Sequence, residues 1–355
     1  MRLKRSGKNL KSFNTYINNM EHVLITGANG EVGHGLINKL KNDKKSGIQI
    51  IALDLNDLDP TLSKLVDVFI KGSVTDKELL ENIFKDHRLD TIYHLAAVLS
   101  TSGEKNPEMA HVVNVGGTFN LLDVANLSSR RENRLIKFLL PSTIAVYGFP
   151  DLKTKSNNNK VKEDDFLRPI TIYGISKLYC ENLGIYYSAY YKLLSKNYKG
   201  IDFRCVRFPG LISADTIPSG GTSDYAPEML HAAAQGKSYE CFVRENSKIH
   251  FMAMPDAINA LLLLKTAPKR KLSRSVYNIR GFSATAKEME VIIKKHFPKA
   301  DISYKVNSER QKIIDSWSED VDDSRAVSDW SWKAKYNFKK AFEEYLIPAI
   351  SKKYS

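Results

Sequence analysis

The chain has 355 residues, of which 43% are hydrophobic and 26% are charged. These values are typical of a soluble globular protein with one large core or two domains. No stretch approaches the ~20 unbroken apolar residues of a membrane helix, so we expect no membrane partner. The net charge is +13, but residues 1–20 hold five Lys or Arg residues and no acid. The remaining net positive charge is spread over segments that contain both acidic and basic residues. This pattern does not favour a nucleic-acid partner.

Residues 1–20 form a basic leader in which Leu10, Phe13, Ile17 and Met20 recur at helical spacing. A basic, acid-free, amphipathic leader is typical of a mitochondrial transit peptide, and this interpretation predicts a protein of the mitochondrial matrix. The alternative is a basic tail ahead of the first strand, which would leave a cytoplasmic protein. The leader lacks the apolar run of a secretory signal.

The three cysteines, Cys180, Cys205 and Cys241, stand far apart in the sequence. Disulfide formation would leave one of them over, and none has the clustered Cys or His neighbours that Zn²⁺ requires. The pattern predicts buried thiols in a reducing compartment and no metal site.

Short β-branched runs alternate with longer helical stretches over the first half of the chain. Strands are predicted at 23–26, 48–53, 66–70, 91–95 and 136–140, and helices at 32–40, 76–85 and 107–127. Repeated β-α units with right-handed crossovers form a parallel, doubly wound sheet. We therefore predict an α/β fold of the Rossmann type.

A polar excursion at 151–165 breaks this alternation and carries no expected core residues. The later elements are predicted as a tyrosine-rich helix at 173–194, a strand at 201–208, a loop with three glycines at 209–223, helices at 255–265, 285–296 and 338–350, and strands at 275–279 and 302–304. We assign residues 21–207 to the Rossmann-type domain. Residues 208–355 are assigned mainly to a smaller C-terminal substrate-binding lobe, with segments that return to the first domain.

A glycine-rich loop joins the first predicted strand to the first predicted helix, with Gly27, Gly30 and Gly33 in a G-x-x-G-x-x-G pattern. The three glycines suit a tight turn, the close approach of a diphosphate and close helix packing, and the helix N-terminus presents free N–H groups. We therefore predict a dinucleotide-binding loop that consists of Gly27, Ala28, Asn29, Gly30, Glu31, Val32 and Gly33.

Asp54 ends the second predicted strand, about 20 residues after the loop, where a ribose 2′-hydroxyl needs an acceptor. A carboxylate there repels a 2′-phosphate, and Leu55 and Asn56, which follow it, offer no arginine to bind one. This predicts NAD as the cofactor rather than NADP. Ser73 and Val74, after the third predicted strand, are expected to border the adenine.

A phenol and an ammonium stand four residues apart on one predicted helix, at Tyr173 and Lys177, and so share a face. The positive charges of Lys177 and of a nicotinamide would lower the pKa of Tyr173, which could then take a hydroxyl proton while a hydride leaves. Ser142 and Thr143 end a strand at the carboxyl edge of the sheet, where hydroxyls can bond a reacting oxygen. Tyr173, Lys177, Thr143 and Ser142 are the predicted catalytic residues; the alternative for the tyrosine–lysine pair alone is a solvent-facing helix pair.

These motifs resemble those of the extended short-chain dehydrogenases/reductases, a group that includes nucleotide-sugar epimerases. Further segments are similar to the L-threonine 3-dehydrogenases of this group, most of all to those of eukaryotic mitochondria. The segments are 94–108, 141–148, 168–177, 203–215, 220–226, 239–242, 254–258 and 315–333. The resemblance covers the chain from about Met20 to the C-terminus. It departs from the common pattern at Ser73, where many relatives carry an acid, and at 251–253.

The resemblance implies the NAD-dependent oxidation of L-threonine at C3 to 2-amino-3-oxobutyrate. Lys177 would hold the nicotinamide ribose, Thr143, helped by Ser142, would orient the reacting oxygen, and Leu211 would border the nicotinamide. The implied substrate-binding residues are Ser100, Thr143, Tyr173, Arg207, Thr222 and Trp317. For Arg207, a candidate partner of the substrate carboxylate, and for Trp317, packing at a strand end and in the core remain the alternatives. The resemblance also implies a homodimer through two long helices, and we expect functional coupling to a 2-amino-3-oxobutyrate CoA ligase.

Two other classes of function remain open. A nucleotide-sugar epimerase or dehydratase would share the glycine loop, Tyr173 and Lys177, but it would need a roomy basic groove, and segments 103–108 and 220–226 argue against it. A catalytically silent NAD-binding scaffold or an RNA-binding protein is the other class. The intact set of Tyr173, Lys177 and Thr143 argues against that class.

Overall fold

The computed structural model describes residues 20–42, 47–158, 160–194, 200–218 and 220–355. The predicted transit peptide, apart from Met20, lies outside the described residues. No helix among the described residues is long and apolar enough to cross a membrane.

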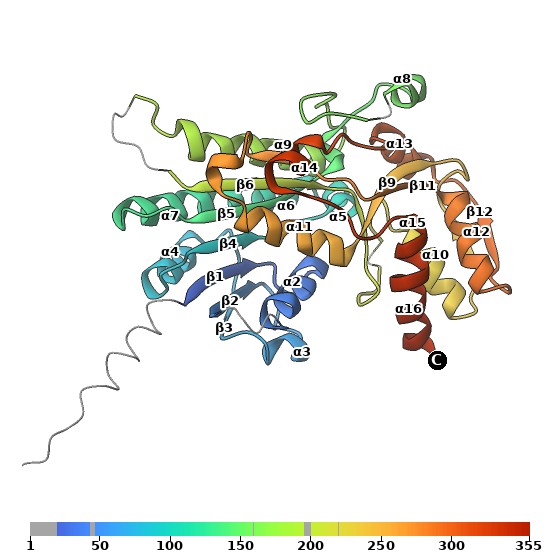
Figure 1. The fold of residues 1–355 in the computed structure, drawn as a ribbon, viewed down its shortest axis with the longest axis horizontal. Helices are drawn as coiled ribbons and strands as arrows, with labels where there is room; N and C mark the ends of the chain where they lie inside the picture. The colour runs from blue at the N-terminus through green and yellow to red at the C-terminus, as the bar shows by residue number, and fades with distance from the viewer. Residues whose placement is uncertain (1–19, 43–46, 159, 195–199, 219) are drawn as a thin grey trace, which may run out of the picture.

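A seven-stranded parallel sheet forms the larger part of the molecule and confirms the predicted Rossmann-type fold (Figure 1). Its strands, in spatial order, are β10 (Val276–Asn278), β6 (Asp202–Phe208), β5 (Lys137–Thr143), β4 (Thr91–His94), β1 (Glu21–Thr26), β2 (Ile48–Asp54) and β3 (Val68–Lys71). The order of connection reverses between β1 and β4. In open α/β sheets, ligands bind at such a switch point, outside the carboxyl ends of the strands.

Helices cover both faces of the sheet, so its central strands are apolar on both sides. One face carries α2 (Glu31–Asn42) and α11 (Met254–Thr266), and the other carries α4 (Lys77–Asp86), α7 (Thr118–Arg131) and α9 (Ile172–Ile185). Within β1, Val23 and Ile25 belong to the first of these cores and Leu24 to the second. This alternation explains why the strands read as unbroken apolar runs.

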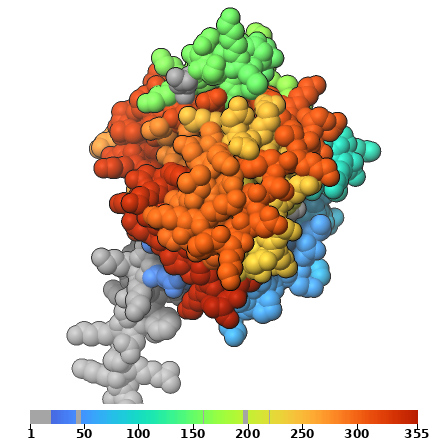
Figure 2. Space-filling model, turned by 90° about the vertical axis from the view of Figure 1, so that its right-hand side faces the viewer, coloured from blue at the N-terminus to red at the C-terminus, as the bar shows by residue number. Residues whose placement is uncertain are grey.

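A smaller lobe lies to the right of the sheet in Figure 1. It contains the strands β11 (Phe282–Thr285), β9 (Lys248–Ala253) and β7 (Gly210–Ile212) in one sheet, β12 (Ile302–Tyr304) and β8 (Tyr239–Cys241) in another, and the helices α10 (Tyr225–Ala234), α12 (Ala286–His296), α13 (Ser308–Ser316), α15 (Phe338–Lys340) and α16 (Ile347–Tyr354). The apolar sides of α10, α12 and α16 share one core. Figure 2 shows this end of the molecule, where the orange and red C-terminal segments form most of the surface.

Local sequence explains where helix α12 begins. Thr285 caps α12, because its hydroxyl accepts the N–H of Glu288 at 3.1 Å while the Glu288 carboxylate accepts the N–H of Thr285 at 2.7 Å. This reciprocal capping satisfies two N–H groups that the helix itself leaves unpaired. The predicted start of this helix at Thr285 is therefore marked in the sequence by a capping box.

Two predicted long helices contain π-helical segments. The predicted helix at 107–127 consists of α6 (Pro107–Ala110), a π segment (His111–Gly117) and α7. The predicted helix at 173–194 consists of α9 and a π segment (Tyr186–Tyr190), and it ends before the predicted boundary. A π turn accommodates an extra residue in a helix, so a regular periodicity does not reveal it.

The prediction that the excursion at 151–165 carries no core residues is wrong. It begins with α8 (Leu152–Asn157), at the upper right of Figure 1, and its Lys155, Val161 and Glu163 are buried. Their partners are remote in the sequence, at Ile314, Val321 and Asn278. A polar composition therefore concealed buried groups, because their compensating partners come from other parts of the chain.

Candidate active site

A cleft of about 780 Å³ opens between the carboxyl edge of the sheet and the lobe. The glycine-rich loop, the ends of β4 and β5, the start of α9 and the segment after β6 all contribute to its lining. Tyr173, Lys177, Ser142 and Thr143 line it together. The four predicted catalytic residues therefore meet beside the predicted nucleotide loop.

Two glycines of the loop are required by the backbone. Gly27 has a φ of +69°, and a Cβ on it would lie 2.6 Å from the main-chain nitrogen of Ala96. A Cβ on Gly33 would lie 2.3 Å from the carbonyl oxygen of Ala28. At Gly30 the nearest atom to a Cβ, at 3.2 Å, belongs to the loop itself, so the cleft side stays open to a diphosphate.

Asp54 supports the loop from the second strand. Its carboxylate accepts the main-chain N–H of Asn29 at 2.9 Å and that of Asn56 at 3.0 Å. The Asn29 side chain accepts the N–H of Asp59 at 2.9 Å, which ties the loop to the start of α3 (Pro60–Ser63). Asp54 therefore lies beside the loop, where it was predicted to meet the adenosine ribose.

Several predicted nucleotide contacts lie outside the cleft lining, namely Ala28, Asp54, Leu55, Asn56, Ser73 and Val74. Leu55 is 66% exposed and Ala28 is fully buried. The Ser73 hydroxyl bonds the Thr75 hydroxyl at 2.8 Å, and Val74 is buried against Gly117. Their predicted contacts with the nucleotide stay predictions.

The start of α9 is fixed beside the end of β5. The Thr171 hydroxyl caps the helix by accepting the N–H of Gly174 at 3.1 Å. A Cβ on Gly174 would lie 2.1 Å from the carbonyl oxygen of Ala145, so only glycine permits this approach. As a result Tyr173 lines the cleft together with Thr143.

Lys177 lies one turn further along α9. Its ammonium donates to the carbonyl oxygen of Pro141 at 2.9 Å and lies 5.9 Å from the centre of the Tyr173 ring. Ser142 is buried, and its hydroxyl has no partner among the described residues.

A small polar pocket adjoins this pair. The Thr222 hydroxyl donates to the Ser100 hydroxyl at 3.0 Å, although the two residues stand 122 positions apart. Trp317, which follows α13, lines the same cleft and is 5% exposed. Leu211, in β7, lines it as well. Ser100, Thr222, Trp317 and Leu211 therefore line one cleft, and their roles at the substrate and the nicotinamide stay predictions.

Residues 23–279 match the model of the NAD-dependent epimerase/dehydratase family. The chain belongs to this family. A loop with open space at Gly30 and an acid at the end of β2 fits the dinucleotide in the name of the family. Among the described residues, no group of three or more His, Cys, Asp or Glu side chains could hold a metal ion.

Members of the family with a named activity are similar over most of the chain. Mitochondrial L-threonine 3-dehydrogenase of Bos taurus is 36% identical over 317 residues, which cover 89% of this chain and 79% of the relative. A solved L-threonine dehydrogenase of Clostridium difficile is 35% identical with a TM-score of 0.83, and the match covers 95% of this chain and 99% of that one. A monomeric L-threonine 3-dehydrogenase from a metagenome is 35% identical with a TM-score of 0.81, over 94% and 100% of the two chains.

Burial opposes the ionisation of the candidate catalytic tyrosine in this family member. Burial raises the pKa of Tyr173 to about 12, and the side chain of Thr143 offsets only part of that effect. Burial also lowers the pKa of Lys177, while Cys180, Cys205 and Glu181 oppose the change. The expected lowering of the Tyr173 pKa involves Lys177 together with a bound nicotinamide, so it stays a prediction, and it must overcome the desolvation of the phenolate.

The prediction that Arg207 binds the substrate carboxylate is not supported. Arg207 is buried, and it donates to the two carboxylate oxygens of Glu181 at 2.9 and 2.6 Å. Its other contacts are the hydroxyl of Tyr147 at 2.9 Å and the carbonyl oxygen of Glu163 at 2.6 Å. Arg207 does not line the cleft, so it packs at the strand end, which was the alternative interpretation.

Sequence reasoning missed Asn114, a buried residue in the π segment. Its amide oxygen accepts the N–H of Val98 at 2.7 Å, and its amide nitrogen donates to the carbonyl oxygen of Val98 at 3.0 Å and to the Ser176 hydroxyl at 3.1 Å. Asn114 thus holds the loop after β4 against α9. The glycine pair Gly116-Gly117 was the local sign of irregularity in this helix.

Several charged or polar cleft residues were also missed, because they come from loops and from the C-terminal helix. They are Asp59, Asp215, Thr216, Asp224 and Lys353. The Thr216 hydroxyl donates to Oε1 of Glu31 at 2.8 Å. The lobe therefore touches the glycine-rich loop across the mouth of the cleft.

Proposed function

We propose that this protein is an L-threonine 3-dehydrogenase, which oxidises L-threonine at C3 to 2-amino-3-oxobutyrate and reduces NAD. The observation that carries the proposal is the meeting of Tyr173, Thr143 and the Ser100–Thr222 pair in the cleft of the glycine-rich loop. The similarity to L-threonine dehydrogenases over nearly the whole chain supports it.

The cleft residues suit NAD in particular. When bound, NAD supplies the acceptor for the hydride from C3. The N–H groups around Gly30 would bind the diphosphate, and Asp54 would bind the adenosine ribose, where a 2′-phosphate of NADP would be repelled. Lys177 would hold the nicotinamide ribose, and Leu211 would border the ring.

The proton path uses residues of α9 and β5. The substrate hydroxyl would lie between Thr143 and Tyr173, with Ser142 behind them. Tyr173, as phenolate, takes the hydroxyl proton, and Thr143 donates a hydrogen bond to the oxygen as it becomes a carbonyl. The pKa of Tyr173, about 12 in this structure, must fall for this step. The ammonium of Lys177 is placed to lower it, and exclusion of water strengthens that attraction.

The amino-acid end of the substrate would lie towards the lobe. The hydroxyls of Ser100 and Thr222 would hydrogen-bond its polar groups, and Trp317 would close the apolar side against the methyl group. Residues of the sheet domain and of the lobe together form this pocket, so substrate specificity would depend on both parts of the chain.

The deciding experiment follows NADH absorbance with L-threonine, L-allo-threonine, L-serine and nucleotide sugars as substrates. We expect NADH to accumulate with L-threonine and not with the sugars. Tyr173→Phe should abolish the reaction and retain NADH binding. Conversion of a nucleotide sugar without net NADH formation would instead identify an epimerase, a function that the same glycine loop, Tyr173 and Lys177 would also serve.

We further propose a homodimer through α9 and the helix that contains the π segment at 111–117. Large apolar side chains are about half exposed along these helices, namely Val112, Phe119, Ile175, Tyr179, Tyr186 and Tyr190. The π segment packs against α9, and exposed apolar side chains that gather on adjoining helices can mark a protein–protein interface. Because one similar enzyme is monomeric, light scattering should decide. We expect a dimer that Tyr179→Arg dissociates, and a monomeric wild-type chain would overturn the proposal.

The basic leader supports a location in the mitochondrial matrix. There, a CoA ligase that consumes 2-amino-3-oxobutyrate would complete the breakdown of threonine. Fusion of residues 1–20 to a fluorescent protein would test the location, with a variant that lacks the five basic charges as its control. Diffuse cytoplasmic fluorescence of the unmodified fusion would overturn it.

A further inference from the structure

The C-terminal helix brings a lysine to the mouth of the cleft. Lys353, in the last turn of α16, lines the cleft, and its ammonium donates to the carbonyl oxygen of Asp215 at 3.1 Å. The next residue, Thr216, bonds Glu31 in the first turn of α2. Lys353 and the N-terminus of α2 are therefore joined through two adjacent loop residues.

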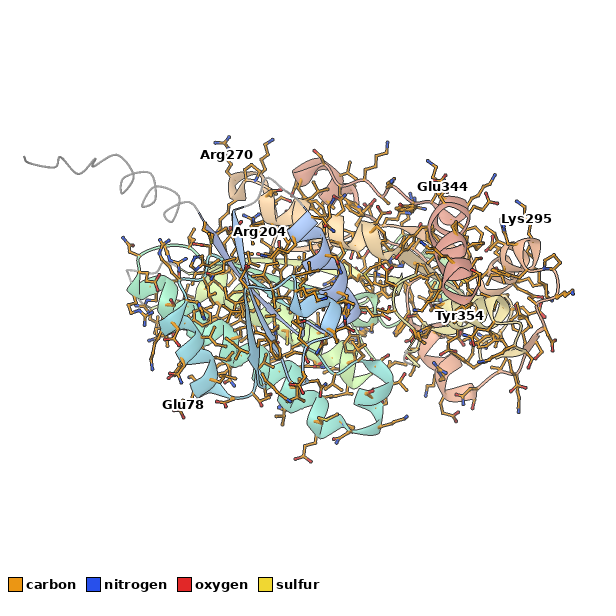
Figure 3. The ribbon with its side chains drawn as sticks, turned by 90° about the horizontal axis from the view of Figure 1, so that it is seen from below. Glu78, Arg204, Arg270, Lys295, Glu344 and Tyr354 are labelled. Atoms are coloured by element: carbon orange, nitrogen blue, oxygen red, sulfur yellow. The ribbon has the colours of Figure 1, made fainter. Side chains whose placement is uncertain are left out.

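α16 is firmly held, so the position of this lysine is defined. Ile347 and Ile350 are buried in the core of the lobe. Tyr354, labelled in Figure 3, hydrogen-bonds Nδ1 of His231 in α10 at 2.8 Å. The loop beneath the helix is anchored as well, since the N–H of Ala214 donates to the Tyr345 hydroxyl at 3.1 Å.

The lining of the cleft contains more acidic than basic side chains. Its acidic lining residues are Glu31, Asp59, Asp215 and Asp224. Its basic side chains, among the residues that the structure describes, are Lys177, Lys353 and the imidazole of His34. Lys177 is buried beside Tyr173 and bound to Pro141. Lys353 is exposed, and the acids alone would repel the two negative charges of a dinucleotide diphosphate.

We propose that Lys353 binds the diphosphate of the coenzyme, so that the C-terminal helix supplies a positive charge opposite the N-terminus of α2. The ammonium would exchange its bond to the Asp215 carbonyl for a charge-assisted bond to a phosphate oxygen, which is the stronger interaction. This inference rests on NAD as the coenzyme, but it does not depend on which substrate is oxidised.

A purely structural role would be different. A lysine in the last turn of a helix interacts favourably with the helix dipole and with free carbonyl groups. In that role Lys353 would stabilise α16 and the Asp215 loop. Lys352 also lies in the last turn, is exposed and does not line the cleft, so Lys352→Gln is the matched control.

The test measures the binding of NADH and of ADP-ribose to the full chain by fluorescence and calorimetry. For Lys353→Gln we expect both dissociation constants to rise by roughly threefold to tenfold, as for one partly exposed charge pair. Lys353→Arg should restore most of the affinity. The salt dependence of NADH binding should become weaker in Lys353→Gln, because a screened attraction is lost, and Lys352→Gln should match the wild type.

Other outcomes overturn the inference. Unchanged affinity in Lys353→Gln, or an equal loss in Lys352→Gln, would leave Lys353 with a structural role only. A loss of affinity accompanied by a lower melting temperature that Lys353→Arg does not restore would do the same. NADH binding without threonine oxidation would overturn the proposed substrate and leave the role of Lys353 intact, whereas a wild-type chain that binds no NADH would overturn both.

Discussion

The Thr216 hydroxyl donates a 2.8 Å hydrogen bond to Oε1 of Glu31, and this bond joins the lobe to the helix that follows the glycine-rich loop. The position is unusual for an acid, because the N-terminus of this helix is where a coenzyme diphosphate is expected. Burial raises the pKa of Glu31, Thr216 lowers it, and the charge of Asp224 raises it further. The molecule therefore holds a carboxylate beside an anion site in a setting that favours the neutral acid.

Glu31→Gln is expected to tighten NADH binding. The glutamine keeps an oxygen that accepts the Thr216 hydrogen bond, and it removes the negative charge. Because the charged form of Glu31 increases as pH rises through its raised pKa, wild-type affinity should fall in that direction, and the variant should lose this dependence. Calorimetry at several pH values measures both, and we expect a gain of roughly threefold to tenfold on the alkaline side.

Glu78→Gln is the control for this change. Glu78 belongs to α4 and lies far from the C-terminal end of the lobe in Figure 3. It should bind NADH as the wild type does at every pH. Weaker binding by Glu31→Gln would show that the carboxylate helps to hold the coenzyme, for instance by ordering the Thr216 loop.

Thr143→Ala should slow the oxidation of threonine. The side chain of Thr143 lowers the pKa of the Tyr173 phenol against the effect of burial. Its removal should reduce kcat/KM by about 10²-fold to 10³-fold and move the rise in activity to higher pH, because the phenolate becomes harder to form. Thr143→Ser keeps the hydroxyl and should retain most of the rate. If the pH profile stays unchanged in Thr143→Ala, the Thr143 hydroxyl does not affect the ionisation of Tyr173.

The sequence predicted those parts of the molecule that depend on neighbours in the chain. Apolar runs gave the strands, and the glycine spacing gave the loop whose Gly27 and Gly33 admit no Cβ. The spacing of Tyr173 and Lys177 gave the reacting face of α9. These features are local, so periodicity and residue type suffice to find them.

The parts that were missed depend on contacts between distant segments. The partner of Arg207 is Glu181, which lies on α9 and which the sequence motifs did not single out. Within the excursion at 151–165, Lys155 and Glu163 are buried because α13 and β10 supply their partners. Lys353 reaches the cleft because α16 packs on α10. Amino-acid composition does not reveal which distant residues come into contact.

Arg207→Met should destabilise the fold more than it alters substrate binding. The Glu181 carboxylate would remain buried without its cation, at a cost of about 3–5 kcal/mol in the free energy of unfolding. The double variant Arg207→Met with Glu181→Met should recover most of that loss and leave KM for threonine near the wild-type value. Urea denaturation and steady-state kinetics measure the two quantities. A stable double variant with a strongly raised KM would return Arg207 to a role in substrate binding.

Lys155→Met should stabilise the protein near neutral pH. Lys155 is 2% exposed, and its ammonium donates to the carbonyl oxygen of Ile314 at 3.0 Å. Burial lowers its pKa from 10.5 to about 8, against the charges of Glu319 and Asp315. The folded chain therefore binds fewer protons than the unfolded chain between these two values, so stability rises with pH across this window. Below it, the cost of burying the charge is fully present.

The methionine has a similar length and carries no charge, so it should raise the free energy of unfolding by about 1–3 kcal/mol at neutral pH. The gain should shrink as the pH approaches the upper end of the window, where the folded wild type already holds a neutral amine. Lys153→Met, on the exposed side of α8, is the control and should change little. Urea denaturation at both ends of the window measures the difference. Destabilisation by Lys155→Met at neutral pH would mean that the bond to Ile314 outweighs the cost of burial.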